Sequence, residues 1–380
     1  MKERASQPQN QSPCPRAPAC SVLTGRRLRN PPAPPHQGRT SLRPGQESIL
    51  PVNTARVMGC WRACGHGAAY GILRSGHEDD AGAHAVPGNA GAMRLAEADR
   101  NMNFIGCDRD FDAARAVLFG APYDSTTSYR PGARFGPAAI RHESFGIETY
   151  SPYQGRDLED CAVHDAGDLE LPFGAPAPAL GMIEAEAARI LDAGKAPVLL
   201  GGEHLVTLGA VRAARARHPD LHVLHFDAHA DLRADYLGSP LSHACVLRRC
   251  HDLLGDGRIF QFGIRSGTRE EFAFMQAGHV TAEPFAAATL PARALPEGTP
   301  VYLTVDLDVL DPAEFPGTGT PEAGGFTFGQ LRAALMDVFA RFRVVAFDLV
   351  ELAPALDASG RSTALACKLL RECLLAHRPA

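Results

Sequence analysis

Residues 222–231 have the sequence HVLHFDAHAD, in which an apolar run of strand length ends in a cluster of metal-type ligands. In an extended chain, side chains at positions i, i+2 and i+4 lie on the same side. Asp227, His229 and Asp231 can therefore face one point, while Ala228 and Ala230 face away. This stretch predicts a buried strand that presents two carboxylates and one imidazole together at its carboxyl end.

Two other apolar runs end in side chains of the same kind. The sequence GGEH (201–204) follows the run 197–200, and DLD (306–308) follows the run 301–305. In an open α/β sheet, the ligand site lies beyond the carboxyl ends of the strands. We therefore expect the three clusters to converge on one site.

The globular part alternates strand-like runs with helix-like stretches, which is the pattern of an α/β fold. Buried, mostly parallel strands are expected at 116–120, 197–200, 222–226, 301–305 and 344–349. Helices are expected at 136–143, 181–193, 205–217, 328–339 and 362–376. The sequence thus predicts a three-layer α/β/α sandwich with a mainly parallel sheet, formed by residues 103–380.

Residues 1–102 differ from the rest, since prolines cluster there and 13 Lys and Arg stand against 7 Asp and Glu. We expect a disordered or non-native extension, most simply an upstream region with Met102 as the functional start. An organellar transit segment and a disordered interaction tail are the alternatives. Deleting residues 1–101 should then leave folding and activity unchanged.

Residues 103–380 are net acidic, because the whole chain has a formal charge of −5 despite its basic N-terminal segment. An acidic body argues against a nucleic-acid partner and weakly favours a cationic or metal-bound ligand. No run approaches the roughly 18 apolar residues that would span a bilayer. We expect a soluble, cytoplasmic protein without a membrane partner.

The six ligands, four carboxylates and two imidazoles, are too many for one catalytic zinc ion. Four clustered negative charges would also repel one another without cations. Two divalent ions resolve both difficulties, and a ligand set without thiolates favours Mn²⁺, with Ni²⁺ or Co²⁺ as alternatives. Two ions sharing a water would lower its pKa and supply hydroxide to attack an electrophilic carbon.

The ordered set of motifs resembles the ureohydrolases, the family of arginases, agmatinases and guanidino-acid hydrolases. Beyond the ligand clusters it includes YRPGARFGP (129–137), SHA (242–244), a segment running from LDP (310–312) to GTGTPE (317–322), and DLVE (348–351). The resemblance extends from about Asn103 to the C-terminus and is strongest to agmatinases. It implies an arginase-like fold and a homo-oligomer, often a trimer or hexamer.

The resemblance also implies a role for each ligand. His204 and Asp231 would bind one ion, His229 and Asp308 the other, and Asp227 and Asp306 would bridge both. Asp231 would also accept a hydrogen bond from the attacking hydroxide. Glu203 is a departure, because many relatives have aspartate at this position, but the charge is conserved.

Two further residues match catalytic positions of the family. His243 resembles the loop histidine that shuttles a proton to the departing amine, a task that suits an imidazole. Glu351 resembles the carboxylate that holds the substrate guanidinium in a two-pronged pair. The alternatives are a solvated loop histidine and a surface glutamate that follows a strand.

The implied reaction is hydrolysis of a guanidinium substrate to urea and an amine, most favourably agmatine to urea and putrescine in polyamine biosynthesis. The loop 232–240 lacks the Asn or Gln expected of an arginase, and its Asp235, with Glu322, would favour a cationic amine over a carboxylate. Arg233 favours the opposite, since it could pair with the carboxylate of 4-guanidinobutyrate. Arginine is the least favoured of the three candidate substrates.

Two hypotheses from other classes stay open. A deacetylase-like enzyme would share the architecture and an Asp-x-His strand end but would use a single zinc ion. A metal-binding paralogue without activity would keep the ligands alone. Counting metal ions and assaying urea would separate these hypotheses from the ureohydrolase.

Overall fold

The computed structural model describes residues 102–283 and 295–378, so the predicted N-terminal extension before Met102 lies outside the described residues. Eight strands form one sheet in the order β4-β1-β5-β10-β9-β6-β7-β8, and every neighbouring pair is parallel. The strands are β1 (Ala116–Ala121), β4 (Val163–Asp168), β5 (Ala196–Gly201), β6 (His222–Phe226), β7 (Ile259–Phe262), β8 (Thr281–Glu283), β9 (Pro300–Asp306) and β10 (Arg343–Val350). The predicted parallel sheet is confirmed.

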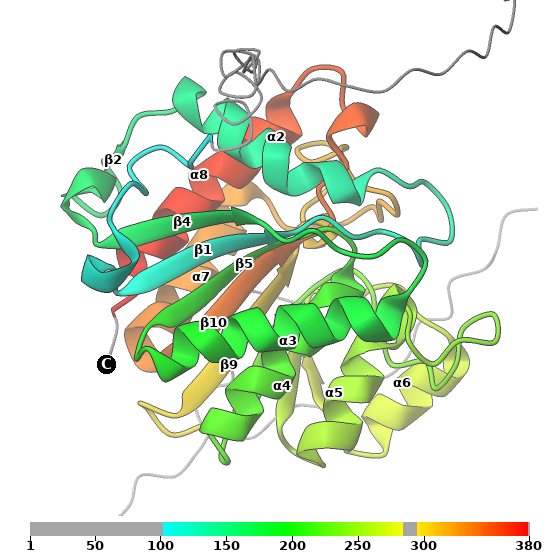
Figure 1. The fold of residues 1–380 in the computed structure, drawn as a ribbon. Coiled ribbons are helices and arrows are strands. Elements are labelled where there is room, and N and C mark those ends of the chain that lie inside the picture. The colour runs from blue at the N-terminus through cyan, green and yellow to red at the C-terminus, as the bar shows by residue number, and fades with distance from the viewer. Residues whose placement is uncertain (1–101, 284–294, 379–380) are drawn as a thin grey trace, which may run out of the picture. The chain divides into compact units, whose positions relative to one another are not determined.

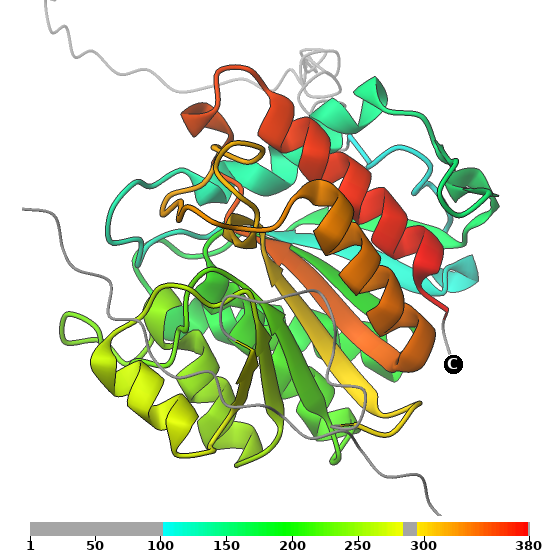
Figure 2. The same cartoon turned by 180° about the vertical axis from the view of Figure 1, so that it is seen from behind.

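Helices cover both faces of this sheet (Figures 1 and 2). On one face lie α3 (Pro176–Asp192), α4 (Thr207–Arg217), α5 (Val246–Leu254) and α6 (Arg269–Gln276); on the other lie α2 (Gly136–Glu143), α7 (Phe328–Arg341) and α8 (Arg361–Ala376). Two clusters of buried apolar side chains match these layers, one packed under α3 and α4 and the other under α7 and α8. The predicted three-layer architecture is therefore observed. The helices bury both faces of the sheet, as a parallel sheet requires.

All five predicted strands and five predicted helices exist; the strand at 222–226 and the helix at 136–143 have the predicted bounds, and the others have shifted ends. The helix expected from residue 181 begins at Pro176, because proline needs no N–H donor in the first turn of a helix. The helix expected from residue 205 begins at Thr207, since His204–Val206 form a 3-10 turn. None of the helices in the described residues is long and apolar enough to cross a membrane.

The sequence reading missed β4, β7, β8, α5, α6 and a short antiparallel hairpin, β2 (Tyr150–Ser151) with β3 (Arg156–Asp157). β4 has the sequence VHDAGD with only two buried positions, and it occupies an edge of the sheet. β7 has only four residues, including Gln261. Short or polar strands lack the apolar run that makes a strand visible in a sequence.

Candidate metal centre and active site

Four neighbouring strands of the sheet, β5, β10, β9 and β6, end at the same edge. His204 follows β5, Glu351 follows β10, Asp306 ends β9, and Asp227 follows β6. Because these strands are adjacent and parallel, their carboxyl ends bring the three predicted clusters into one place. The sequence expectation that the clusters converge agrees with this topology.

The six predicted ligands form one cluster around two imidazole nitrogens. His204 Nδ1 lies 3.1 Å from Asp227 Oδ2, 3.2 Å from Asp231 Oδ2 and 3.4 Å from Asp306 Oδ2. His229 Nδ1 lies 2.9 Å from Asp308 Oδ2 and 3.5 Å from Asp227 Oδ1. The two oxygens of Asp227 thus face different histidines, which is the arrangement expected of a carboxylate that bridges two ions.

The atoms around the ring of His204 provide a site for a cation. Its Nδ1 is buried and makes no hydrogen bond, although three carboxylate oxygens surround it. The other ring nitrogen, Nε2, lies 2.9 Å from Thr304 Oγ1, whose hydroxyl donates to Asp348 Oδ1 at 2.6 Å. Thr304 must therefore accept from His204 Nε2–H, which leaves a bare lone pair on Nδ1. A nitrogen that faces three carboxylate oxygens in this way fits a bound cation.

The pKa values of the aspartates give the same result. Burial, together with the neighbouring charge of Asp227, raises the pKa of Asp231 to about 7. Burial and the charges of Asp308 and Asp227 raise the pKa of Asp306 well above its ordinary value. These carboxylates cannot all ionise together without positive charge between them, because like charges in a buried site disfavour ionisation.

A second layer of polar side chains orients the ligands. His225 Nε2 lies 2.7 Å from Asp227 Oδ2, and Gln261 Nε2 approaches His225 Nδ1 at 3.0 Å. Asp348, which accepts from Thr304, also accepts from Thr207 and Tyr302. Such outer partners fix the ring orientation of metal-binding histidines. Asp348 thus orients His204 through Thr304, and His225, which lies close enough to His204 and Asp227 to face the same point, orients Asp227.

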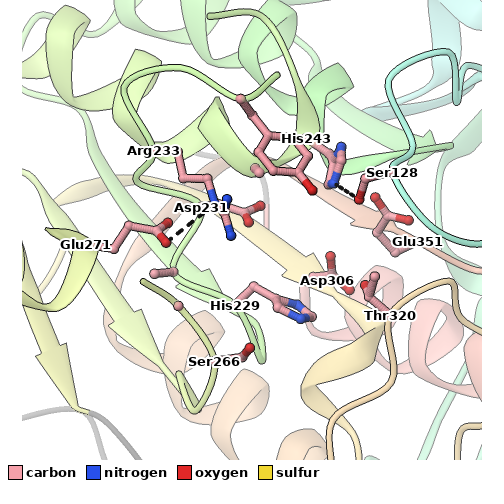
Figure 3. Close-up of a pocket in the computed structure, with 14 residues that line it drawn as sticks. Ser128, His229, Asp231, Arg233, His243, Ser266, Glu271, Asp306, Thr320 and Glu351 are labelled. Atoms are coloured by element: carbon pink, nitrogen blue, oxygen red, sulfur yellow. Dashed lines mark hydrogen bonds and ion pairs between the residues drawn. The ribbon is translucent and has the colours of Figure 1, made fainter. Parts of the chain in front are cut away.

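A pocket of about 250 Å³ opens beside the ligand cluster (Figure 3). Its walls carry His229, Asp231 and Asp306 of the cluster together with His243 and Glu351. In Figure 3, Ser128 and Glu351 lie on the side opposite Glu271 and Arg233. The remaining lining residues are Ala230, Tyr236, Ala244, Ser266, Gly267 and Thr320.

Glu351 combines burial with an unusual backbone conformation. Its Oε1 accepts a hydrogen bond of 2.7 Å from His204 N, and its φ of 66° lies in the left-handed region. Burial and the nearby charge of Glu203 raise the pKa of the Glu351 carboxyl well above its ordinary value. Strained and buried carboxylates of this kind are concentrated at functional sites.

His243 stands at the pocket wall at the start of a 3-10 turn. Its Nδ1 lies 3.4 Å from Thr126 Oγ1 and its Nε2 lies 3.3 Å from Ser128 Oγ. Burial lowers the pKa of His243 to about 4, so its imidazole is neutral near pH 7. A neutral imidazole can accept a proton at one nitrogen and pass it on.

Two residues predicted to bind the substrate do not line the pocket. Asp235 is exposed, and its Oδ1 accepts a hydrogen bond of 2.9 Å from Gly238 N, so the side chain turns back onto its own loop. Glu322 is half-exposed, with Oε1 at 3.9 Å from His229 Nε2. Asp235 therefore does not face the pocket, whereas Glu322 lies beside the pocket, near His229.

The sequence reading missed several lining residues, among them Ser128, Tyr236, Ser266, Glu271 and Thr320. Ser128 directly precedes the YRPGARFGP motif, and Tyr236 lies in the loop after Asp231, so their positions carried a weak signal. Ser266 and Glu271 carried none, because they belong to a segment, β7 to α6, whose elements were not predicted.

Comparisons with known proteins agree with this three-layer fold. Residues 114–376 match the model of the arginase family. The agmatinase of Bacillus subtilis (strain 168) is 46% identical over 286 residues, covering 74% of this chain and 99% of that protein. The guanidinobutyrase of Pseudomonas aeruginosa is 36% identical over 281 residues, covering 70% of this chain and 87% of that protein.

Among solved structures, a putative agmatinase from Clostridium difficile has a TM-score of 0.68 and 45% identity, covering 70% of this chain and 98% of that chain. The match between family model and chain spans more than half of the sequence. This chain belongs to the arginase family. The predicted ureohydrolase class and the predicted hydrolase activity on guanidino compounds are confirmed.

Proposed function

We propose that this protein hydrolyses agmatine to urea and putrescine, using two divalent metal ions. One observation carries the proposal: a cluster of six metal-type ligands adjoins a pocket at the carboxyl edge of the sheet, and His243 and Glu351 lie in the wall of that pocket. Membership of the arginase family supports the reaction class.

We propose that the ions are Mn²⁺, because the ligands are oxygen and imidazole without a thiolate. His204 with Asp231, and His229 with Asp308, would each hold one ion, and Asp227 and Asp306 would contact both. The distances support the two pairs and the place of Asp227 between the two histidines. Asp306 lies near His204, with Oδ2 3.4 Å from its Nδ1. When bound, the ions would lower the pKa of water and so supply the nucleophile at neutral pH. Asp231, at the pocket wall, would accept a hydrogen bond from the nucleophile.

Glu351 would hold the substrate. A carboxylate and a guanidinium pair through two parallel hydrogen bonds, which fixes the plane of the guanidinium. The backbone N–H of His204 donates a hydrogen bond to Oε1 of Glu351, and this hydrogen bond limits rotation of the carboxylate. The guanidinium carbon would then lie close to the ligand cluster, because Glu351 is hydrogen-bonded to the backbone of His204.

His243 would move the proton that the reaction requires. Attack by water forms a C–O bond and releases a proton, and the C–N bond to the amine breaks only if the amine nitrogen gains one. His243 is neutral near pH 7, so it can accept the first proton and donate it to the departing amine. The products are urea and protonated putrescine.

The charges of the pocket support agmatine over a guanidino acid. Arg233 is the cation that could hold a substrate carboxylate, but its Nε lies 3.7 Å from Glu271 Oε2 and its guanidinium stacks 4.5 Å from the centre of the Tyr236 ring. Glu271 and Tyr236 also line the pocket. An arginine that already has an acidic partner attracts a carboxylate less strongly. The higher identity to an agmatinase than to a guanidinobutyrase points the same way.

The test compares urea release from agmatine, 4-guanidinobutyrate and arginine at equal concentrations with Mn²⁺ present. We expect the highest kcat/KM for agmatine. A clearly higher kcat/KM for either acid would overturn the choice of substrate. Counting metal ions at full activity adds a second criterion, because one ion per chain would contradict the binuclear site.

The family resemblance also leads us to propose a cytoplasmic homo-oligomer, a trimer or hexamer. Light scattering at working concentration measures the assembly directly. A monomer that retains full activity would contradict this part of the proposal.

A further inference from the structure

A buried carboxylate that binds no metal supports the loop next to His243. Glu203 is fully buried, and it accepts two hydrogen bonds of 2.8 Å from the same residue, one from Thr126 N to Oε2 and one from Thr126 Oγ1 to Oε1. Thr127 Oγ1 makes a longer contact of 3.4 Å to Oε2. Glu203 therefore fixes both the backbone and the hydroxyl of Thr126.

Thr126 in turn holds His243 at two points. His243 N donates to Thr126 Oγ1 at 3.1 Å, and the ring nitrogen Nδ1 of His243 lies 3.4 Å from the same oxygen. The three residues come from separate segments, which follow β1, β5 and β6. The contacts thus connect three loops at the pocket edge of the sheet.

The hydrogens available in the hydrogen bonds from Glu203 through Thr126 to His243 determine which nitrogen of His243 carries the proton. Burial raises the pKa of Glu203 to about 7, and the hydrogen bonds from Thr126 oppose this shift because they favour the ionised carboxylate. A hydroxyl has one hydrogen and accepts up to two hydrogen bonds, and the ionised carboxylate can only accept. The Thr126 hydrogen goes to Glu203, so Thr126 Oγ1 accepts from both the backbone N–H and the Nδ1–H of His243. The other ring nitrogen, Nε2, is then bare and faces Ser128 Oγ, 3.3 Å away at the pocket wall.

We propose that Glu203 and Thr126 are positioning residues that hold the ring of His243 and keep its proton on Nδ1, so that Nε2 is the nitrogen presented to the substrate. This inference rests on the proton-transfer role proposed for His243. Neither residue touches the substrate. In serine hydrolases a carboxylate holds the tautomer of a catalytic histidine in the same way, and its loss lowers the rate although the geometry is kept.

Three threonine variants test the positioning role. Thr126→Val removes the hydroxyl at nearly constant shape, Thr126→Ser restores it, and Thr127→Val removes a hydroxyl that contacts Glu203 but not His243. We expect Thr126→Val to lower kcat roughly 10- to 100-fold, which is part of what general acid–base catalysis contributes. KM for agmatine and the metal content should stay near wild type. Thr126→Ser and Thr127→Val should stay within about threefold of wild type.

A fourth variant tests the tautomer itself. In Glu203→Gln, the side-chain amide must donate to Thr126 Oγ1 if its oxygen is to accept from Thr126 N. The threonine hydrogen would then point at His243 Nδ1 and move the imidazole proton to Nε2. We expect kcat to fall although a crystal structure shows the ring of His243 in its original place.

The outcomes separate this proposal from the proposed function. If wild-type enzyme releases no urea from agmatine, the function fails, and crystal structures of Thr126→Val and Thr126→Ser still test whether the hydroxyl holds the ring. If wild type is active and Thr126→Val has wild-type kcat, the positioning role is overturned. Equal losses of kcat in Thr126→Val and Thr127→Val would also overturn it, because they would indicate a general weakening of the loop.

Discussion

Two residues at the pocket have a backbone conformation that their residue types seldom adopt. Asp231 has φ of 53° and Glu351 has φ of 66°, and both line the pocket. Aspartate tolerates the left-handed region fairly well, whereas glutamate pays a steric cost there. The hydrogen bond from Glu351 N to Gly202 O, 2.9 Å long, helps to hold the second of these conformations. At the residue scale, the site depends on backbone geometry that the neighbouring strands impose.

The first prediction concerns the charge of Glu351. Glu351→Gln keeps the shape but replaces one acceptor oxygen with a donor that faces the substrate cation. We expect kcat/KM for agmatine to fall by about 2–4 kcal/mol in transition-state terms, roughly 30- to 1000-fold, because one partner of a buried charged pair is lost. Metal content should not change. Glu184→Gln on the exposed side of α3 is the control, and equal kinetics of the two variants would contradict the clamp.

A second prediction concerns Asp306, whose Oδ2 faces His204 while Oδ1 accepts from Asp308 N at 2.8 Å. Asp306→Asn should lower both activity and the number of bound ions per chain, because one anionic ligand is lost. The loss of kcat should exceed the roughly 10- to 100-fold typical of an outer-layer change. Kinetics and metal analysis on the same sample check it. Near-normal turnover would show that the binuclear assignment is wrong.

At the scale of elements, arginines hold the loops that shape the pocket. Arg265 donates to the carbonyl oxygens of Asp308 and Glu322, each at 2.8 Å, and so connects the end of β9 to the loop beside His229. Arg130 donates to the carbonyl oxygens of Thr318 and Gly319, each at 3.0 Å. The GTGTPE segment is therefore shaped by side chains from distant parts of the sequence.

The third prediction concerns the close approach between the loops after β1 and β5. A Cβ at Gly202 would lie 2.0 Å from Tyr123 O and 2.7 Å from Tyr123 N, and both are backbone atoms that cannot rotate away. Gly202→Ala should therefore lower the free energy of unfolding by at least about 2 kcal/mol. It should also lower activity, because Thr126 follows Tyr123 and Glu351 N bonds to Gly202 O.

The matched control is Gly181→Ala in α3, where an added Cβ meets nothing within 4 Å. This change should be neutral or should stabilise the protein by about 0.5–1 kcal/mol, since alanine favours a helix. Urea denaturation and urea-release assays measure both variants. Equal stability of the two would mean that the loops can separate at little cost.

For the whole molecule, the fourth prediction concerns stability against pH. His377 is buried at the end of α8 beside the rings of Phe339 and Phe347, and its Nε2 lies 3.0 Å from Val344 O. Burial lowers the pKa of His377 below its ordinary value of 6.5. The unfolded chain then binds a proton at a higher pH than the folded chain does. The stability that burial of the neutral His377 contributes is fully present above about pH 6.5 and is lost as pH falls below that value.

The His377→Gln variant keeps a hydrogen-bond donor for Val344 O but cannot take up the proton. We expect its free energy of unfolding to decrease less steeply between pH 7 and pH 5 than that of wild type. His142→Gln, on the exposed side of α2, serves as the control and should leave the slope unchanged. An identical slope in all three proteins would remove His377 from the explanation.

The sequence by itself determined the layers and the ligand set. Apolar runs of strand length followed by DAHAD, GGEH and DLD predicted both a parallel sheet and the edge of it that carries the site, because parallel strands end together. Glu351 and His243 were also predicted from the sequence, and the structure places both on the pocket wall. Local pattern suffices for the ligand clusters, since the alternation of side chains along a strand is a local property. His243 and Glu351 were predicted from the resemblance to the ureohydrolases.

Only the tertiary structure decided which residues complete the pocket. Asp235 was expected at the substrate, but hydrogen bonding within its own turn points it elsewhere. Ser128, Glu271 and the contacts of Thr126 with Glu203 and His243 join segments far apart in the chain. The free energy of such contacts depends on how three loops fold over the sheet, and no periodicity of the sequence records that arrangement.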